Sequence, residues 1–224
     1  MKFKHKYKLY SLLISFILLT GMMLNHGEDI HGKVVCFGDS ITHGAKVDGH
    51  SWVYFLNKNH SQINFVNAGR NGRKTADKKE LLPVLKENPD ANYYLIFLGV
   101  NDLKDGTEQM VKDCVENMQW MIDKNRQTNK DAHILILTPT DINLKTMAPI
   151  NVRKKYNENT KQSLVMLKNR YKKLADKNSI QFLSLLHTVS PPNYVDGLHP
   201  NVTGQKQIAN AVWKGMNIIF EDQK

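Results

Sequence analysis

Five short apolar runs, separated by stretches of helical periodicity, constrain the fold of this chain more than any other feature. The runs are rich in β-branched and aromatic residues, and most of them end at or near a glycine or a proline. Because they are almost continuously apolar, they are typical of strands buried on both faces of a parallel sheet. We predict strands at residues 33–37, 63–67, 93–98, 132–137 and 180–185.

Helices are predicted between and after these strands. The clearest covers residues 107–126, in which Met110, Met118 and Ile122 share one face. Strands that alternate with helices indicate a parallel sheet with right-handed crossovers. We therefore expect residues 28–224 to form one domain, a three-layer α/β/α sandwich with about five strands. The other helices are predicted at residues 51–59, 75–87, 152–177 and 203–219, the last of them capped by Thr203.

Polar loops that contain glycine follow four of the predicted strands. In open parallel sheets, ligands bind outside the carboxyl ends of the strands, so these loops are expected to converge on one edge. They supply a hydroxyl, amide donors, an imidazole and a carboxylate, which are the groups that acyl transfer requires. The loops are Gly38-Asp39-Ser40, residues 67–72, Gly99-Val100-Asn101-Asp102 and Asp196-Gly197-Leu198-His199-Pro200.

A serine, a histidine and an aspartate in these loops are candidates for a catalytic triad. The Ser40 hydroxyl is a weak nucleophile and needs an adjacent base, for which His199 is suited. Asp196 lies three residues before His199 and can bond the other ring nitrogen, which would hold the required tautomer. We therefore predict Ser40, Asp196 and His199 as the catalytic residues.

The negative oxygen of a tetrahedral intermediate needs hydrogen-bond donors, and three are expected. They are the backbone N–H groups of Ser40 and Gly72 and the side-chain amide of Asn101. Glycine at position 72 leaves the backbone uncovered, so that its N–H can approach a substrate. Asp39 and Asp102 are expected to order their own loops instead of taking part in the chemistry.

Each of these motifs alone has a simpler interpretation. Gly-Asp-Ser and Gly-x-Asn-Asp occur in ordinary turns, and the pair Asp196 and His199 suits a metal site or, with Asn201, a helix start. No GxSxG or HExxH motif is present, and no cysteine–histidine spacing indicates a metal. The order of the motifs, each after a predicted strand, favours the catalytic interpretation.

In this order the motifs resemble the four blocks of the SGNH hydrolases, also called the GDSL esterase/lipase family. The resemblance extends from about Val34 to Trp213. It implies a flavodoxin-like sheet with strand order 2-1-3-4-5, and hydrolysis of esters or thioesters without a metal; we predict no cofactor. It assigns the oxyanion donor of the second block to Gly72, with Gly69 as the alternative.

The expected substrate is a small-molecule, lipid or glycan ester, and short-chain esters, O-acetyl groups and lysophospholipids are all candidates. A non-catalytic carbohydrate-binding domain at the cell surface is the alternative, although it would be expected to have a broken site. Arg70, Arg73 and Lys74 flank Gly72. They either draw anionic substrates to the site or form a solvated turn.

The net charge of +10 does not indicate a nucleic-acid-binding protein. Lys2, Lys4, Lys6 and Lys8 supply four of these charges, which leaves +6 for the rest of the chain. No dense basic stripe with interleaved aromatic residues is present, so we predict no nucleic-acid partner.

The first 27 residues have the layout of an export signal. The four lysines precede an apolar run at residues 9–24. No A-x-A-like cleavage site follows, and the run is slightly short for a membrane span of about 20 residues. Both a cleaved signal peptide and an N-terminal membrane anchor therefore remain open. Either places the domain outside the cytoplasm, as a secreted protein or at the extracytoplasmic face of the membrane.

The two cysteines, Cys36 and Cys114, both lie in apolar patterns. We predict two buried free thiols, with a disulfide between them as the alternative.

Overall fold

The computed structural model describes residues 32–221, in which five parallel strands form one sheet. The strands are β1 (Gly32–Gly38), β2 (Ile63–Gly69), β3 (Tyr93–Phe97), β4 (His133–Leu137) and β5 (Gln181–Leu183). Their order is β2-β1-β3-β4-β5, which confirms the predicted flavodoxin-like sheet. β1 pairs with β2 on one side and with β3 on the other, so the strand order reverses at β1. In sheets of this kind, ligands bind at that point.

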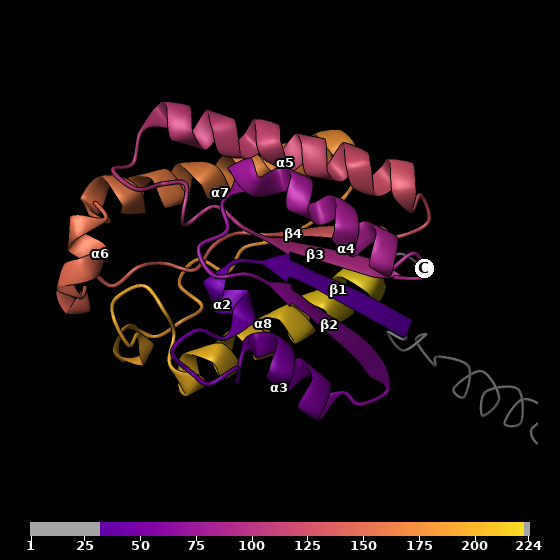
Figure 1. Cartoon of the computed structure of the whole chain (residues 1–224), viewed down its shortest axis with the longest axis horizontal. Coiled ribbons are helices and arrows are strands. Elements are labelled where there is room, and N and C mark those ends of the chain that lie inside the picture. Colours follow the sequence, from indigo (N-terminus) through magenta and orange to yellow (C-terminus); the bar gives the residue numbers. More distant parts are fainter. Residues whose placement is uncertain (1–31, 222–224) are drawn as a thin grey trace, which may run out of the picture.

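Helices connect the strands and complete the predicted three-layer sandwich. The α-helices are α2 (Ser40–His43), α3 (Trp52–Asn59), α4 (Leu81–Glu87), α5 (Glu108–Thr128), α6 (Pro149–Arg153), α7 (Glu158–Asn178) and α8 (Val202–Glu221). The 3₁₀ helices are η1 (Thr75–Glu80), η2 (Leu144–Thr146) and η3 (Pro191–Asn193). Figure 1 shows α4, α5 and α7 on one face of the sheet, with α3 and α8 on the other. The strand arrowheads point toward α2 and α6, which marks the carboxyl edge.

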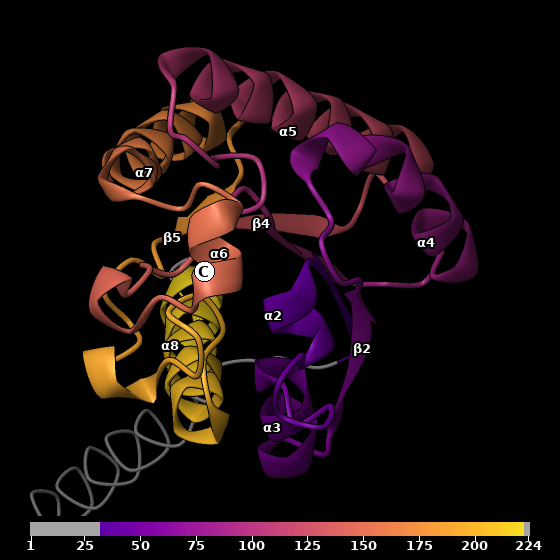
Figure 2. The same ribbon diagram turned by 60° about the vertical axis from the view of Figure 1, so that its left-hand side comes forward.

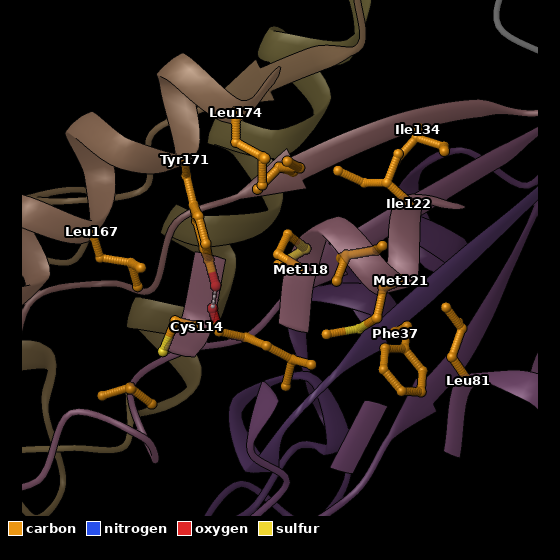
Figure 3. Packing of buried hydrophobic residues seen from close by; sticks show 14 of the residues in the cluster. Phe37, Leu81, Cys114, Met118, Met121, Ile122, Ile134, Leu167, Tyr171 and Leu174 are labelled. Carbon is orange, nitrogen blue, oxygen red and sulfur yellow. Dashed lines mark hydrogen bonds between the residues drawn. The ribbon is translucent and has the colours of Figure 1, made fainter. Parts of the chain in front are cut away.

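Two apolar cores lie on opposite faces of the sheet. In the first, side chains of α5 and α7 meet those of the sheet, among them Met118, Tyr171 and Phe37 (Figure 3). In the second, α3 and α8 pack against the other face. Cys114 belongs to the first core and Cys36 to the second. Both are therefore buried free thiols separated by the sheet, as predicted.

The single helix predicted at residues 152–177 is two helices in the structure. α6 ends at Arg153, Lys155 adopts a positive φ of 67°, and Asn157 caps α7 with a capping box. An asparagine cap favours a new helix start over continuation of the old one. The break buries Tyr156. Figure 2 shows α6 over the same edge of the sheet as α2.

Two other predicted helices differ from the structure in detail. Residues 75–87 are helical as predicted, but they form η1 followed by α4, and the irregular backbone lies at Asp77 inside η1. The helix α8 begins at Val202 and not after Thr203. Asn201 caps it, since its side chain accepts the N–H of the residue three positions later.

The predictions for residues 1–27 lie outside the described residues. Within residues 32–221, no helix is both long enough and apolar enough to cross a membrane.

Candidate active site

Ser40, His199 and Asp196 form one hydrogen-bonded chain at the carboxyl edge of the sheet. Ser40 Oγ lies 2.9 Å from His199 Nε2, and His199 Nδ1 lies 2.9 Å from Asp196 Oδ2. A carboxylate only accepts hydrogen bonds, so Nδ1 carries the ring proton and Nε2 accepts from the Ser40 hydroxyl. The structure thus brings together all three predicted residues, although Ser40 and His199 are 159 positions apart in the chain.

The Asp196 carboxylate is held by its own segment. Its Oδ1 accepts the backbone N–H groups of Leu198 at 3.1 Å and of His199 at 2.8 Å. Burial acts to raise the pKa of Asp196, but these hydrogen bonds and the contact with His199 outweigh it. The pKa therefore lies well below its usual range, and Asp196 stays ionised where it can stabilise a protonated His199.

Ser40 is the first residue of α2 and follows the end of β1 by two positions. Asp39 caps this helix, because its Oδ1 accepts the N–H of Ile41 at 2.9 Å. The prediction that Asp39 orders its own loop is confirmed. Burial raises the pKa of Asp39 to about 6, while the N–H of Ile41 and the charge of His199 lower it. The first N–H groups of a helix have no acceptor within it, so the Ser40 N–H is available to a ligand.

Of the two glycines considered for the second block, Gly72 faces the site. It lines the same cavity as Ser40, has a φ of 73°, and its N–H has no acceptor among residues 32–221. The N–H of Gly69 donates to Asn67 Oδ1 at 2.9 Å. A Cβ at position 69 would also lie 2.3 Å from the backbone nitrogen of His43. Gly69 therefore serves close packing, and Gly72 can present an N–H to a ligand.

The Asn101 side chain is buried and held at both ends. Its Nδ2 donates to the carbonyl oxygen of Arg73 at 3.2 Å and lies 3.5 Å from Asp39 Oδ2. Its Oδ1 accepts from the hydroxyl of Tyr156 at 3.0 Å. The Arg73 carbonyl requires a donor, and the Tyr156 hydroxyl can supply one. These partners therefore fix which end of the amide carries the N–H groups.

Arg70 and Arg73 are not free to attract substrates, so that part of the hypothesis is wrong. Arg73 is buried, and its guanidinium donates to backbone carbonyls at the ends of β1 and β2, each at 2.6 Å. Both arginines form ion pairs with Glu80, at 2.7 Å from Arg70 and 3.0 Å from Arg73. The two arginines stabilise the loop that carries Gly72. Of the three cations, Lys74 alone has no ion pair within residues 32–221.

Asp102 joins two of the loops. Its carboxylate accepts the N–H of Thr75 at 3.0 Å and the Thr75 hydroxyl at 2.7 Å. Burial raises the pKa of Asp102, and the bonds from Thr75 reduce that shift. The contact agrees with the prediction that Asp102 has an ordering role.

A cavity of about 220 Å³ lies beside Ser40 and His199. Pockets that enclose drug-sized ligands are larger, roughly 300–1,000 Å³, so this one suits a small group. A hollow of about 530 Å³ lies at the opposite edge, near Gly32 and Ile63, and contains no predicted site residue. Besides the predicted residues, the smaller cavity is lined by Ala45, Asn71, Lys154, Tyr156 and Leu198.

Sequence reasoning missed the roles of Tyr156, Arg73 and Lys154 at this site. Each depends on contacts with segments far away in the chain, which no local pattern reveals. For Tyr156 one signal was available: Asn157 followed three positions later by Thr160 forms a capping box. That pattern would have ended the preceding helix before the tyrosine.

Across residues 32–221, no cluster of three or more His, Cys, Asp or Glu side chains could hold a metal ion.

Solved structures share this fold at low sequence identity. A carbohydrate acetylesterase family member from Sinorhizobium meliloti matches with a TM-score of 0.71 and 20% identity, over 84% of this chain and 99% of that chain. The M. smegmatis aryl esterase matches with a TM-score of 0.68 and 18% identity, over 84% and 99% of the two chains. A catalytic mutant of an acetylxylan esterase from Geobacillus stearothermophilus gives 0.65 and 16%, over 84% and 95%.

The fold and the family match together define a carboxylic ester hydrolase. The model of the GDSL-like lipase/acylhydrolase family matches residues 36–207, which is most of the chain, and the chain belongs to that family. The resemblance found in the sequence motifs is therefore confirmed. A search among curated proteins finds no match.

Proposed function

We propose that this enzyme is a serine esterase that removes short acyl groups, acetyl above all, from a larger alcohol. Ser40 is the nucleophile, His199 the general base and Asp196 its partner. One observation carries the proposal. The hydrogen-bonded chain from Asp196 through His199 ends at a Ser40 hydroxyl that lines a small cavity.

The first half of the reaction transfers the acyl group to the enzyme. Ser40 Oγ attacks the carbonyl carbon of the ester while its proton passes to His199 Nε2. The carbonyl oxygen becomes negative, and the N–H groups of Ser40, Gly72 and Asn101 stabilise it. His199 then returns the proton to the alcohol oxygen, the ester bond breaks, and the acyl group remains on Ser40.

The second half releases the acyl group. A water molecule gives a proton to His199 Nε2 and attacks the acyl carbon, and the same donors stabilise the new oxyanion. The bond to Ser40 Oγ then breaks as His199 returns the proton to that oxygen. The acid leaves, and the hydrogen-bonded chain is restored.

The size of the cavity supports a short acyl group. About 220 Å³ leaves little room for a long hydrocarbon chain, which would have to extend beyond the cavity. Two matched structures are described as a carbohydrate acetylesterase and an acetylxylan esterase, which supports O-acetyl groups on glycans as substrates. Turnover is therefore expected to fall with acyl length and to be slowest for lysophospholipids.

A substrate panel with two serine variants tests the proposal. The panel contains 4-nitrophenyl esters from acetyl to dodecanoyl, acetylated xylo-oligosaccharides and a lysophospholipid. Ser40→Ala should lower kcat by about 10⁴-fold or more with the fold intact, because nucleophilic catalysis is lost. Ser61→Ala, at an exposed serine on the far edge of the sheet, is the matched control.

Two outcomes would end the proposal. Retained turnover in Ser40→Ala would remove Ser40 as the nucleophile. A wild-type protein that binds glycans but hydrolyses no ester in the panel would favour the non-catalytic carbohydrate-binding alternative.

We also propose that the enzyme works outside the cytoplasm. The support is the sequence of residues 1–27, with four lysines before an apolar run. Removal of these residues should retain the protein in the cytoplasm, as cell fractionation would show. Export of the shortened protein would contradict the proposal.

A further inference from the structure

Lysines near the active-site cavity fall into two groups. Lys155 pairs with Asp105 at 3.3 Å. Lys74, Lys104 and Lys154 have no ion pair with any residue in the range 32–221. We call the second group, whose ammonium groups form no direct ion pair within this range, the lysine triplet.

The lysine triplet comes from three segments that meet at the cavity. Lys154 follows α6 and lines the cavity together with Ser40 and His199. The Lys104 ammonium lies 5.7 Å from the ring centre of Tyr156, which lines the same cavity.

The third member, Lys74, is two residues from Gly72, which also lines the cavity. It directly follows Arg73, whose carbonyl oxygen accepts from Asn101. Lys74 itself lines a neighbouring hollow with Asp102, Asp113 and Glu116, so Lys154 is the member of the triplet that lines the active-site cavity.

The electrostatics of Lys104 show that the three charges affect one another. Burial lowers the pKa of Lys104, and the charges of Lys74 and Lys154 lower it further. The charge of Asp102, whose carboxylate also accepts from the Thr75 hydroxyl, acts in the opposite direction. Like charges held close together repel one another, and a bound anion would relieve that repulsion.

We propose that the lysine triplet binds an anionic group, a phosphate or a carboxylate, that the substrate carries close to its scissile ester. The preferred substrates are then anionic acyl esters. This inference rests on the proposed hydrolysis at Ser40, since it assigns the group next to the bond that Ser40 attacks. Two sources share this chemistry, namely an acylated polyol phosphate and the headgroup of a lysophospholipid.

Matched ester pairs test the proposal with the full-length protein. The kcat/KM values of 1-acetylglycerol 3-phosphate and neutral 1-acetylglycerol are compared at low salt, and their ratio is the readout. Lys154→Gln should lower this ratio by about tenfold, because one charge-assisted contact is lost. Lys155→Gln, which removes the adjacent paired lysine, is the control and should leave both values within about twofold.

A longer ester separates the two sources. If 1-decanoylglycerol 3-phosphate is turned over faster than the acetyl compound, and Lys154 is required, the anion belongs to a lysophospholipid and the short-acyl preference proposed above is wrong. Faster turnover of the acetyl compound assigns the bound anion to an acylated polyol phosphate. An unchanged ratio in both Lys154→Gln and the triple Lys74, Lys104 and Lys154 variant would overturn the proposal, while turnover dependent on Ser40 would leave the esterase function standing.

A binding measurement keeps the inference testable even if the protein hydrolyses no ester. Titration calorimetry with glycerol 3-phosphate should show binding to wild type and to Ser40→Ala, reduced about tenfold by Lys154→Gln. Equal binding, or none, in wild type and Lys154→Gln would overturn the anion site independently of catalysis.

Discussion

The segment with Asp196 and His199 and the group formed by Ser40, Gly72 and Asn101 face the same cavity, but different contacts hold them. In the described part of the chain, the Asp196 carboxylate accepts from N–H groups of only two residues, Leu198 and His199, which lie two and three positions later. Asn101 is held by Arg73, Asp39 and Tyr156, which lie 28, 62 and 55 positions away. Local contacts thus hold the Asp196 carboxylate, although backbone carbonyls of its segment also accept from Asn143, Ala148 and Asn151, whereas distant residues hold the oxyanion side.

This difference predicts how the two parts of the site respond to substitution. We call Asp196 and His199 the local half, and Ser40, Gly72 and Asn101 with the residues that hold them the tertiary half. A substitution of the Asp196 side chain should affect chemistry and little else, because the hydrogen bonds of its carboxylate within residues 32–221 all come from its own segment. A substitution in the tertiary half should pass to its neighbours, since Asn101, Asp39 and Tyr156 share contacts. The following predictions test that contrast, from the largest expected effect to the smallest.

The local half is tested by Asp196→Asn. The variant should lower kcat for 4-nitrophenyl acetate by about 10⁴-fold, because an amide no longer holds the required tautomer of His199. The circular dichroism spectrum should be unchanged. Asp141→Asn is the control, since Asp141 pairs with an exposed histidine, His187, and should keep kcat within about twofold. Nearly full activity in Asp196→Asn would give that segment a purely structural role.

The tertiary half is tested first by Asn101→Ala. The variant should lower kcat by about 100- to 1000-fold with little change in KM, because the lost donor acts chiefly in the transition state. Steady-state kinetics with the acetyl ester separate the two constants. Asn64→Ala, at an exposed position on β2, should match wild type. A higher KM at constant kcat would assign Asn101 to ground-state binding and not to the oxyanion.

Asp39 predicts a pH dependence of stability. Its pKa is raised to about 6 in the folded protein by burial, against about 3.9 for an unperturbed aspartate. The folded state therefore binds more protons than the unfolded state between these values, so stability falls as pH rises from about 4 to about 6. The cost above pH 6 is up to about 3 kcal/mol, from two units at about 1.4 kcal/mol each.

The variant Asp39→Asn removes this titration while it keeps an oxygen that can cap α2. Urea unfolding at pH 4, 5, 6 and 7 should show the variant gaining stability relative to wild type across that range. A stability difference that does not change with pH would mean that Asp39 has an ordinary pKa. The hydrogen bonds and charges around Asp39 would then offset the effect of burial on its pKa.

The same contrast explains which features were predictable from sequence. The strand order and the motif loops follow from apolar runs, glycines and the resemblance to a family, and Asp196 and His199 are only three residues apart. The orientation of Asn101 depends on Arg73 and Tyr156, and no periodicity links these positions. The sequence pattern predicts a continuous helix through Tyr156, because the residue with positive φ that breaks the helix is Lys155 and not a glycine.

Tyr156→Phe gives the smallest and most specific test. The change removes only the hydroxyl that donates to Asn101 Oδ1, so kcat should fall by about three- to tenfold with KM unchanged. The effect should disappear in an Asn101→Ala background, since the hydroxyl acts through that side chain. Tyr94→Phe, which removes a buried hydroxyl bonded to the Asn88 carbonyl, is the control. If the losses from Tyr156→Phe and Asn101→Ala simply multiply, Tyr156 does not position Asn101, and the oxyanion side is less interdependent than its hydrogen bonds indicate.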